Sequence, residues 1–442
     1  MRRVLTTLPV LLAVLLATLV AVVPDRGGDA RGPLDVPVEV TSYACPGGPG
    51  RSVVLSQVEP GDEARVTPGD DAEPVEELLD PQVSRSADTG RGDLVVRQSG
   101  PGSGAVGHTG DRRDDALVVQ RCPGIVDEAW FVDLASTSSH DSVLVLSNLA
   151  DAPAVVDLGL WGTEGQVEGV GTSGVVVDPG AVRRIPMTEL AAGEEMLALR
   201  VERQRGAVAA AVEDVAPRGR EVLAGAQAPT RSPSLGPLAA SGGERVLTLV
   251  NPTDTSGRAR VEAFGPDGPF VPEGLDEVEL PSASVTSVAL PRTLGEEPVS
   301  LVLDSDVPVT GSVRTSGSGD VDAVVASAPW TGDALVPTAV AGAPLSDLVV
   351  ASPDGAVVTV EGRSEAGEVV ATQQLELTAG TTRQVALDEV VADGVVEIVL
   401  RSPDDDVSAT GTFSRGGRAS VTLLPAPVTA LGADVRWGRP RL

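Results

Sequence analysis

The chain has 442 residues, a formal net charge of −30 at pH 7 and a sequence pI near 4.3, and only 2% of its residues are aromatic. A chain this acidic repels phosphate backbones, which argues against nucleic acid as a partner. Its hydrophobic cores must be built mainly from Val, Leu and Ala, and its length allows several such cores.

The N-terminus begins Met-Arg-Arg and continues with an uncharged apolar run, Val4 to Val23. About 20 apolar residues can span a bilayer, and the arginines hold the start of the chain in the cytoplasm. We therefore expect a signal anchor or transmembrane helix over residues 1–24, a linker over 25–35 and a body outside the membrane. A signal peptide cleaved near Gly28-Asp-Ala30, which would release a secreted protein, is the alternative.

Residues 36–135 are interpreted as a degenerate β-sandwich module, because their closing strands follow the plan of later segments. Its middle, Glu59 to Asp93, is acidic and rich in Pro and Gly. This stretch shows no strand periodicity and only a hint of helix over Val75–Leu79. We expect a mobile loop there.

The two cysteines of the chain, Cys45 and Cys122, flank the first and last strands of this module. Outside the cytoplasm they are expected to form a disulfide that joins the two ends of the module. The chain-entropy model gives such a bridge roughly 4 kcal/mol. A zinc site is not favoured, because two sulfurs and two distant histidines do not make a tetrahedral set.

Three later segments have the same order of elements. Val143–Asn148, Val246–Asn251 and Leu348–Pro353 are similar and lie about a hundred residues apart, and Asn148 and Asn251 are the only asparagines in the sequence. Such repetition indicates an array of equal units. The predicted β-sandwich modules cover residues 136–238, 239–341 and 342–442, the last with a C-terminal tail.

The strands of the third module are short, rich in Val, Leu and Thr, and separated by turn residues, which is typical of an all-β fold. Seven short strands in about a hundred residues indicate an immunoglobulin-like β-sandwich. The linkers, Ala216–Gly243 and Trp330–Pro344, are short enough that neighbouring modules should touch and form a rod. The predicted strands are Arg245–Val250, Arg258–Phe264, Val278–Leu280, Val285–Leu290, Val299–Leu303, Val309–Arg314 and Val321–Ala326.

Several short motifs have the residues of a known site but not the predicted structural context that such a site needs. Gly169–Gly174 and Gly102–Gly107 have the glycine spacing of a dinucleotide fingerprint, but neither is predicted between a strand and a helix. We therefore expect no bound nucleotide. Arg91-Gly-Asp93 is the tripeptide that adhesive ligands display, and three common residues in this chain do not establish that role.

His108 and His140 lie in polar, turn-like surroundings, and we expect them to be solvated because no Ser or Cys nucleophile is evident beside them. Trp161 and Trp330 fall where a loop would expose them. Trp130-Phe131 is expected at the joint between the first and second modules.

Acidic and amide side chains complete the candidates. Asp304-Ser-Asp306 and Asp404-Asp-Asp406 are interpreted as solvated turns, with calcium between domains as the alternative. Asn148 and Asn251 should hydrogen-bond their own backbone at a turn. No catalytic residue, metal site or cofactor is predicted.

The apolar N-terminus and four short motifs together resemble a family of uncharacterised actinobacterial envelope proteins, secreted or membrane-anchored, whose domain has unknown function. The resemblance implies an envelope location and transfers no activity and no catalytic residues. The motifs are Cys45-Pro-Gly47, Cys122-Pro-Gly124, Trp130-Phe131 and the strand Leu247–Pro252.

From these observations we predict a non-catalytic, membrane-tethered protein that acts as an interaction or scaffold module in the cell envelope. Its partners would be the membrane, through the N-terminal helix, and an envelope protein or polymer. The alternatives are an envelope polysaccharide hydrolase or lyase that uses acidic residues, and a secreted polymer-binding protein.

Overall fold

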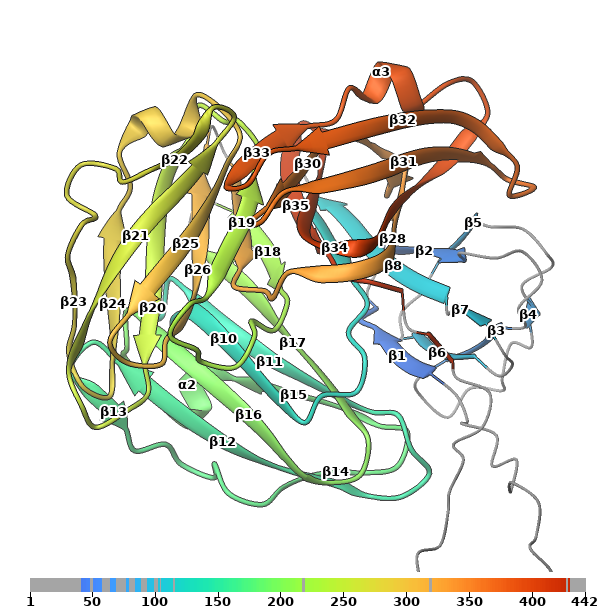
Figure 1. Ribbon diagram of the computed structural model, residues 1–442. Helices are drawn as coiled ribbons and strands as arrows, with labels where there is room; N and C mark the ends of the chain where they lie inside the picture. Colours follow the sequence, from blue (N-terminus) through green and yellow to red (C-terminus); the bar gives the residue numbers. More distant parts are fainter. Residues whose placement is uncertain are drawn as a thin grey trace, which may run out of the picture. The chain divides into compact units, whose positions relative to one another are not determined.

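The computed structural model describes residues 41–47, 51–57, 64–68, 77–78, 84–88, 94–98, 102–103, 105–113, 116–216, 219–317, 320–426 and 428–429 (Figure 1). Nearly all regular structure in these residues is β, which confirms the all-β prediction. The exceptions are three four-residue turns, α2 (Met187–Leu190), η1 (Arg292–Gly295) and α3 (Leu387–Val390).

None of the helices in the described part of the chain has the length and apolar character needed to span a bilayer. The predicted anchor over residues 1–24 and the linker over 25–35 lie outside the described residues.

Strands β10 to β18 form two facing sheets, here called copy two. The A sheet has the order β10-β16-β12-β13, with β14 also paired to β12, and the B sheet has the order β15-β11-β17-β18. Alternating apolar residues, such as Leu144 and Leu146 on β11, are buried between the sheets. The bounds are β10 (Glu128–Leu134), β11 (Asp141–Asn148), β12 (Ala154–Gly162), β13 (Gly165–Val167), β14 (Val175–Val177), β15 (Val182–Pro186), β16 (Leu197–Arg205), β17 (Val208–Ala216) and β18 (Gly219–Leu223).

Copy three, strands β19 to β27, repeats this plan. Its A sheet has the order β19-β25-β21-β22, with β23 beside β21, and its B sheet has the order β24-β20-β26-β27. All seven strands predicted for this segment are confirmed, while β19 and β22 were not predicted. The bounds are β19 (Ser234–Leu238), β20 (Glu244–Asn251), β21 (Gly257–Gly265), β22 (Gly268–Phe270), β23 (Val278–Leu280), β24 (Ser284–Ala289), β25 (Val299–Ser305), β26 (Thr310–Ser316) and β27 (Val321–Val325).

Copy four, strands β28 to β35, differs in one long strand. Residues 395–402 of β34 pair with β28 and β31, whereas residues 408–415 pair with β30 and β35, so that one strand belongs to both sheets. The bounds are β28 (Trp330–Pro337), β29 (Ala339–Val340), β30 (Ala343–Ser352), β31 (Ala356–Ser364), β32 (Val369–Leu377), β33 (Thr381–Gln384), β34 (Val395–Arg415) and β35 (Gly417–Leu423).

Copy one, strands β1 to β9, has the A-sheet order β1-β6-β3-β4 and the B-sheet order β5-β2-β8-β9, and β7 pairs with β36 (Val428–Thr429). Three of its strands lie in the stretch 59–93, so the prediction of a loop without strands was wrong, and β4 lies within 75–79, where the local pattern has a hint of helix. Pairing with distant strands outweighs the weak local pattern there. The bounds are β1 (Thr41–Cys45), β2 (Ser52–Gln57), β3 (Ala64–Pro68), β4 (Glu77–Leu78), β5 (Ser84–Asp88), β6 (Leu94–Gln98), β7 (Gly102–Ser103), β8 (Ala105–Arg113) and β9 (Ala116–Arg121).

Each copy is closed in the same way. An isolated β-bridge joins the first strand of the copy to a residue just after its last strand. These bridges are Tyr43 with Gly124, Trp130 with Ala226, Leu235 with Ala326 and Ala334 with Pro425.

The first strands of three copies precede the predicted module boundaries. β10, β19 and β28 lie before residues 136, 239 and 342, yet they pair with β16, β25 and β34 of the following units. The predicted linkers Ala216–Gly243 and Trp330–Pro344 therefore contain strands. β19 includes Pro237, which an edge strand tolerates because one side of its backbone needs no partner.

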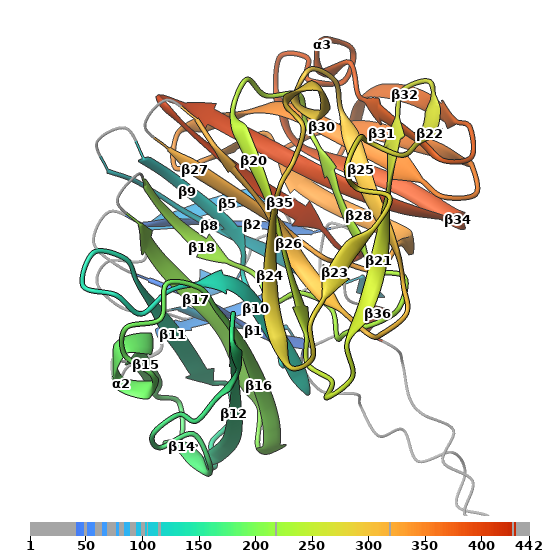
Figure 2. The ribbon, with the colours of Figure 1, turned by 90° about the vertical axis from the view of Figure 1, so that its left-hand side faces the viewer.

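The cores of the copies are partly joined. β9 buries Leu117 and Val119 in the apolar cluster of copy four, and Trp130 of copy two lies in the cluster of copy three. β35 of copy four contacts β9 of copy one (Figure 2). A linear rod of modules would not contain that contact, so the rod prediction was wrong.

Candidate functional site

The last strands of the four copies lie together. β9 contacts β18 and β35, and β27 contacts the same two strands (Figure 2). The four strands therefore form a closed ring of contacts. Each of these strands pairs with a single strand of its own copy, β9 with β8, β18 with β17, β27 with β26 and β35 with β34, so one edge of its backbone has no strand partner among the described residues of its sheet. The four copies therefore meet at the edge strands β9, β18, β27 and β35.

A cavity of about 310 Å³ lies at this meeting point and is lined by residues of all four copies. Its walls are mainly apolar and include Val119 on β9, Val222 on β18, Val325 on β27 and Val421 on β35. The segments that leave β9, β18 and β35 are exposed at Gly124, Ala224 and Leu424, and these residues also line the cavity. The opening is therefore on the side where the chain leaves these strands.

Two buried polar side chains line the same cavity on the side of copy one. In the described structure, neither the Tyr43 hydroxyl nor the Gln120 amide nitrogen has a hydrogen-bond partner. Burial raises the pKa of Tyr43, and the nearby Arg121 guanidinium opposes that rise. Arg121 itself donates hydrogen bonds to the carbonyls of Leu424 and Pro425, at 2.6 and 3.0 Å.

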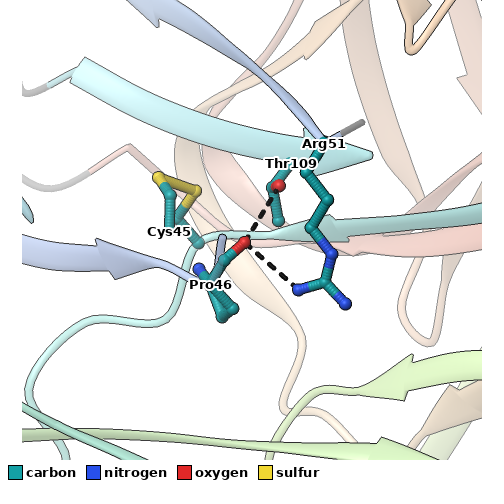
Figure 3. Close-up of a disulfide and its surroundings, with 5 residues drawn as sticks. Cys45, Pro46, Arg51 and Thr109 are labelled. Carbon is teal, nitrogen blue, oxygen red and sulfur yellow. Dashed lines mark hydrogen bonds between the residues drawn. A yellow bond between two sulfur atoms is a disulfide. The ribbon is translucent and has the colours of Figure 1, made fainter. Parts of the chain in front are cut away.

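The disulfide between Cys45 and Cys122 is beside this polar end. Its S–S distance is 2.09 Å, and the two residues are separated by 77 positions in the sequence (Figure 3). The carbonyl of Pro46 accepts hydrogen bonds from Arg51 and Thr109, at 3.2 and 3.4 Å. These contacts hold the backbone directly after Cys45, and the predicted disulfide is confirmed.

Gly107 on β8 makes room for the bridge. A Cβ atom at this position would lie 2.8 Å from the Cys122 Sγ atom and 2.8 Å from the Tyr43 ring. Real Cβ atoms do not approach other atoms so closely, and the interior is already packed. A larger residue at this position would therefore push both the disulfide and Tyr43 out of place.

A group of buried charges lies where copies two and three meet. Arg314 on β26 extends to Asp133 on β10, with 2.5 Å between the guanidinium and the carboxylate. The same guanidinium lies 3.1 Å from Asp214 on β17 and 2.9 Å from Glu221 on β18. β10 bulges at Asp133, whose φ is 69°, and this irregularity turns the residue out of the regular strand alternation.

The ionisation of this group follows from its burial. Burial raises the pKa of Glu221 to about 8, although Arg314 opposes the rise. Burial alone would also raise the pKa of Asp214, but His140 and Arg314 outweigh it and hold that pKa below its usual value. His140 Nε2 lies 3.0 Å from the Asp214 carboxylate, which also accepts a hydrogen bond from Ser142.

Asp320 and Asp322 connect copy three to its neighbours. Asp320 accepts hydrogen bonds from the backbone N–H groups of Leu117 in copy one, at 3.2 Å, and Arg418 in copy four, at 2.8 Å. Asp322 accepts hydrogen bonds from the N–H and the hydroxyl of Ser420, both at 2.6 Å. Burial raises the pKa of both carboxyl groups.

Glu397 on β34 is another carboxyl group that is fully buried. Burial raises its pKa to about 8, and the positive charge of Arg363 acts in the opposite direction.

Several sequence predictions for single residues were wrong. His108 is fully buried on β8, where burial lowers its pKa to about 3, and neither ring nitrogen has a hydrogen-bond partner among the described residues. His140 is half-buried against Asp214. Trp161 and Trp330 are buried rather than exposed. In each case a neighbouring strand or copy covers the side chain, although the polar residues around it in the sequence indicate exposure.

The aromatic pair of copy two is also placed differently. Trp130 packs on Trp161, with ring centroids 4.8 Å apart, and extends into the cluster of copy three. Phe131 points into the core of copy two. The pair therefore does not lie at the joint between copies one and two, because alternate residues of β10 face opposite sides of its sheet.

The asparagine prediction was right. Asn148 Oδ1 accepts a hydrogen bond from the N–H of Ala150, and Asn251 Oδ1 accepts one from Thr253, both at 3.0 Å. Each amide also donates to backbone carbonyls across the turn, including Ala152 for Asn148, at 2.8 Å. The two turns are built alike.

Other candidates carry no site in this structure. Gly169–Gly174 lies between β13 and β14, with no helix after it. The described residues contain no group of three or more His, Cys, Asp or Glu side chains placed to hold a metal ion. Arg91-Gly-Asp93 lies outside the described residues.

Comparison with known proteins identifies a family without an assigned activity. No curated protein matches the chain. A solved structure named "Biofilm associated protein - BSP domain" aligns over 89% of this chain and 98% of its own, with 9% identity and a TM-score of 0.14, which is too low to support any argument. Residues 107–388 match the family of unknown function DUF5719. Because this match covers more than half of the chain, the protein belongs to DUF5719.

Proposed function

We propose that the protein is a non-catalytic, extracytoplasmic interaction or scaffold module of the cell envelope, tethered by its apolar N-terminal segment. The observation that carries the proposal is the use of charged side chains at the joints between copies. Arg314 pairs with three carboxylates of the neighbouring copy, and Asp320 bonds to the two copies beside its own. Charges used in this way hold the copies in place, as a scaffold requires.

The disulfide supports the location. Bridges such as Cys45–Cys122 form and persist in oxidising compartments and are rare in the cytosol. We also propose that each copy is an immunoglobulin-like module, since each combines two antiparallel sheets over an apolar core. The resemblance to actinobacterial envelope proteins is in keeping with this location.

The edge of copy four is the surface that we propose for a partner. β32 has nine residues and pairs only with β31, and its outer edge has no strand partner among the described residues. Val369 and Val370, at the start of β32, are 49% and 47% exposed. Copies two and three have only three-residue strands, β13, β14, β22 and β23, at the corresponding place. A nine-residue strand with one edge free of a strand partner in the described part of the chain is suited to accept an added strand from an envelope protein, at the end that the two valines occupy. That end lies away from the contact of β32 with α3 through Gln373 and Glu389.

Crosslinking in intact cells tests this proposal. The full chain should yield a crosslinked partner through its extracytoplasmic body, and Val370→Lys on the β32 edge should abolish the product, because charged residues block strand addition. Val170→Lys is the matched control, since Val170 is 74% exposed in a loop of copy two. An unchanged crosslink in the Val370 variant would contradict the proposed surface.

The alternative function, an envelope polysaccharide hydrolase or lyase, would need an acidic residue that reaches the polymer. Glu221 and Glu397 have the raised pKa values of general acids, but both side chains are buried. Incubating the full chain with envelope polysaccharide and measuring soluble products separates the two functions. A product that disappears in Glu221→Gln or Glu397→Gln would contradict the non-catalytic proposal.

A further inference from the structure

The cavity between the four copies is large enough for a ligand. An engineered apolar protein cavity of about 150 Å³ accepts benzene, and this cavity of about 310 Å³ is roughly twice as large. It therefore has space for about twelve non-hydrogen atoms by the same measure. That volume is at the lower limit of ligand pockets in proteins.

The composition of the wall restricts the ligand. Valine and alanine residues from all four last strands line the cavity, and among them are Ala323 on β27 and Val421 on β35. An apolar body is stabilised on such a wall in proportion to the area that it removes from water. The exposed Glu128 also lines the cavity, with its carboxylate 2.6 Å from Trp130 Nε1, from which it accepts a hydrogen bond.

The polar end adds a second requirement. The Tyr43 hydroxyl and the Gln120 amide nitrogen are buried hydrogen-bond donors without a partner in the described structure, and both residues line the cavity. Buried donors without partners are costly to the folded state. A ligand oxygen that accepts from them would remove this cost, and the nearby Arg121 guanidinium favours an oxygen with negative charge.

We propose that this cavity binds an acyl chain of about ten carbons that ends in a carbonyl or carboxylate oxygen. The chain lies among the valines and alanines of the last strands. The terminal oxygen lies at the copy-one side and accepts hydrogen bonds from Tyr43 and Gln120. Such a ligand is bound by all four copies at once, so its binding depends on the copies meeting as they do.

The test uses the purified full chain and the fluorescence of N-phenyl-1-naphthylamine, a dye that emits in apolar sites. We expect the dye to bind and decanoic acid to displace it, whereas decyltrimethylammonium, which has no acceptor oxygen, should displace it at least tenfold less well. A monodecanoyl lysophospholipid, used below its critical micelle concentration so that the dye has no other apolar phase, forms a second arm. Displacement by this lipid and not by decanoic acid would assign the bound acyl chain to a lipid, and displacement by neither ligand would overturn the proposal.

Two kinds of variant separate a ligand site from a packing void. Ala323→Leu fills the cavity and should weaken dye binding at least tenfold, while Ala371→Leu, on β32 away from the cavity, should not change it. Tyr43→Phe should weaken decanoic acid about tenfold while leaving dye binding intact, since one hydrogen bond is lost. Decanoic acid affinity that is unchanged in Tyr43→Phe, or dye binding that is unchanged in Ala323→Leu, would overturn the proposal.

The Tyr43 variant also keeps the test valid if Ala323→Leu fails to fold. Removing a buried hydroxyl that has no partner should leave the ligand-free protein as stable as before, or more stable. Decanoic acid should raise the melting temperature of the wild type more than that of Tyr43→Phe. An equal rise in both proteins would show that the hydroxyl does not contact the ligand.

Discussion

Replacing Arg314 by methionine removes the cation from a group of three carboxylates. The Arg314 side chain is 11% exposed, and its partners Asp214 and Glu221 are 0% and 8% exposed. Removing one member of a buried ion pair costs about 3–5 kcal/mol, because the remaining charge is left buried without compensation. We therefore expect the free energy of unfolding of Arg314→Met to fall by that amount near pH 8.

The pH dependence of this loss has a definite sign. Without Arg314, the pKa of Glu221 rises further above its unfolded value and the pKa of Asp214 rises from its lowered value, so the folded variant binds protons that the folded wild type has released. The stability of the variant therefore falls as pH rises from about 4.5 toward 8. In the wild type, the lowered pKa of Asp214 contributes stability above pH 3.8, which is lost as pH falls. The variant should thus be closer to the wild type at pH 5 than at pH 8.

Urea unfolding followed by circular dichroism at pH 5 and pH 8 measures both effects. Arg292→Met is the matched control, because Arg292 pairs with Glu244 at 2.8 Å but is 84% exposed. Such surface pairs contribute about 0–1 kcal/mol, so this variant should stay close to the wild type. If Arg314→Met lost no more stability than Arg292→Met, or lost more at pH 5 than at pH 8, the reasoning would be refuted.

Three further predictions concern other parts of the fold. Glu397→Gln should raise the free energy of unfolding by a few kcal/mol at pH 8 and little at pH 5, since the raised pKa of about 8 makes ionised Glu397 a cost only above the unfolded value; equal urea midpoints of variant and wild type at pH 8 would contradict this. Replacing Cys45 and Cys122 together by alanine should cost about 2–5 kcal/mol in non-reducing urea unfolding, and dithiothreitol should have an effect on the wild type alone. Asn251→Ala should cost about 1–3 kcal/mol because it leaves backbone carbonyls of its turn without donors, and Asn148→Ala should cost a similar amount by the same assay; a large difference between the two would show that the turns are not equivalent.

Seven of the strands of copy three were predictable because they are short runs, rich in Val, Leu and Thr, between clear turn residues. The repeated asparagines were informative for the same reason, since Asn148 and Asn251 make the same turn in copies two and three. β19 was missed because Gly236 and Pro237 make this short edge strand look like a linker. Sequence patterns therefore identify a strand when its own residues have the apolar pattern of a strand and turn residues lie at its ends.

The meeting of the four copies could not be predicted in the same way. His108 and Trp161 are buried by residues far away in the sequence, and nothing in their local pattern indicates those neighbours. One signal was present in Leu117-Val-Val119, a run that is apolar on both faces of β9. A strand buried on both faces has this composition. That composition indicates a covered strand but not which copies cover it, so it predicts neither the cavity nor the Arg314 group.

The central claim, that the last strands of the four copies meet, is tested most directly by hydrogen exchange at Leu117 and Arg418. The N–H groups of these residues, in copies one and four, both donate to the Asp320 carboxylate of copy three. We predict that both amides are protected in the wild type and that Asp320→Ala lowers the protection of both together. Rapid exchange of these amides in the wild type, or protection that Asp320→Ala does not change, would contradict the claim.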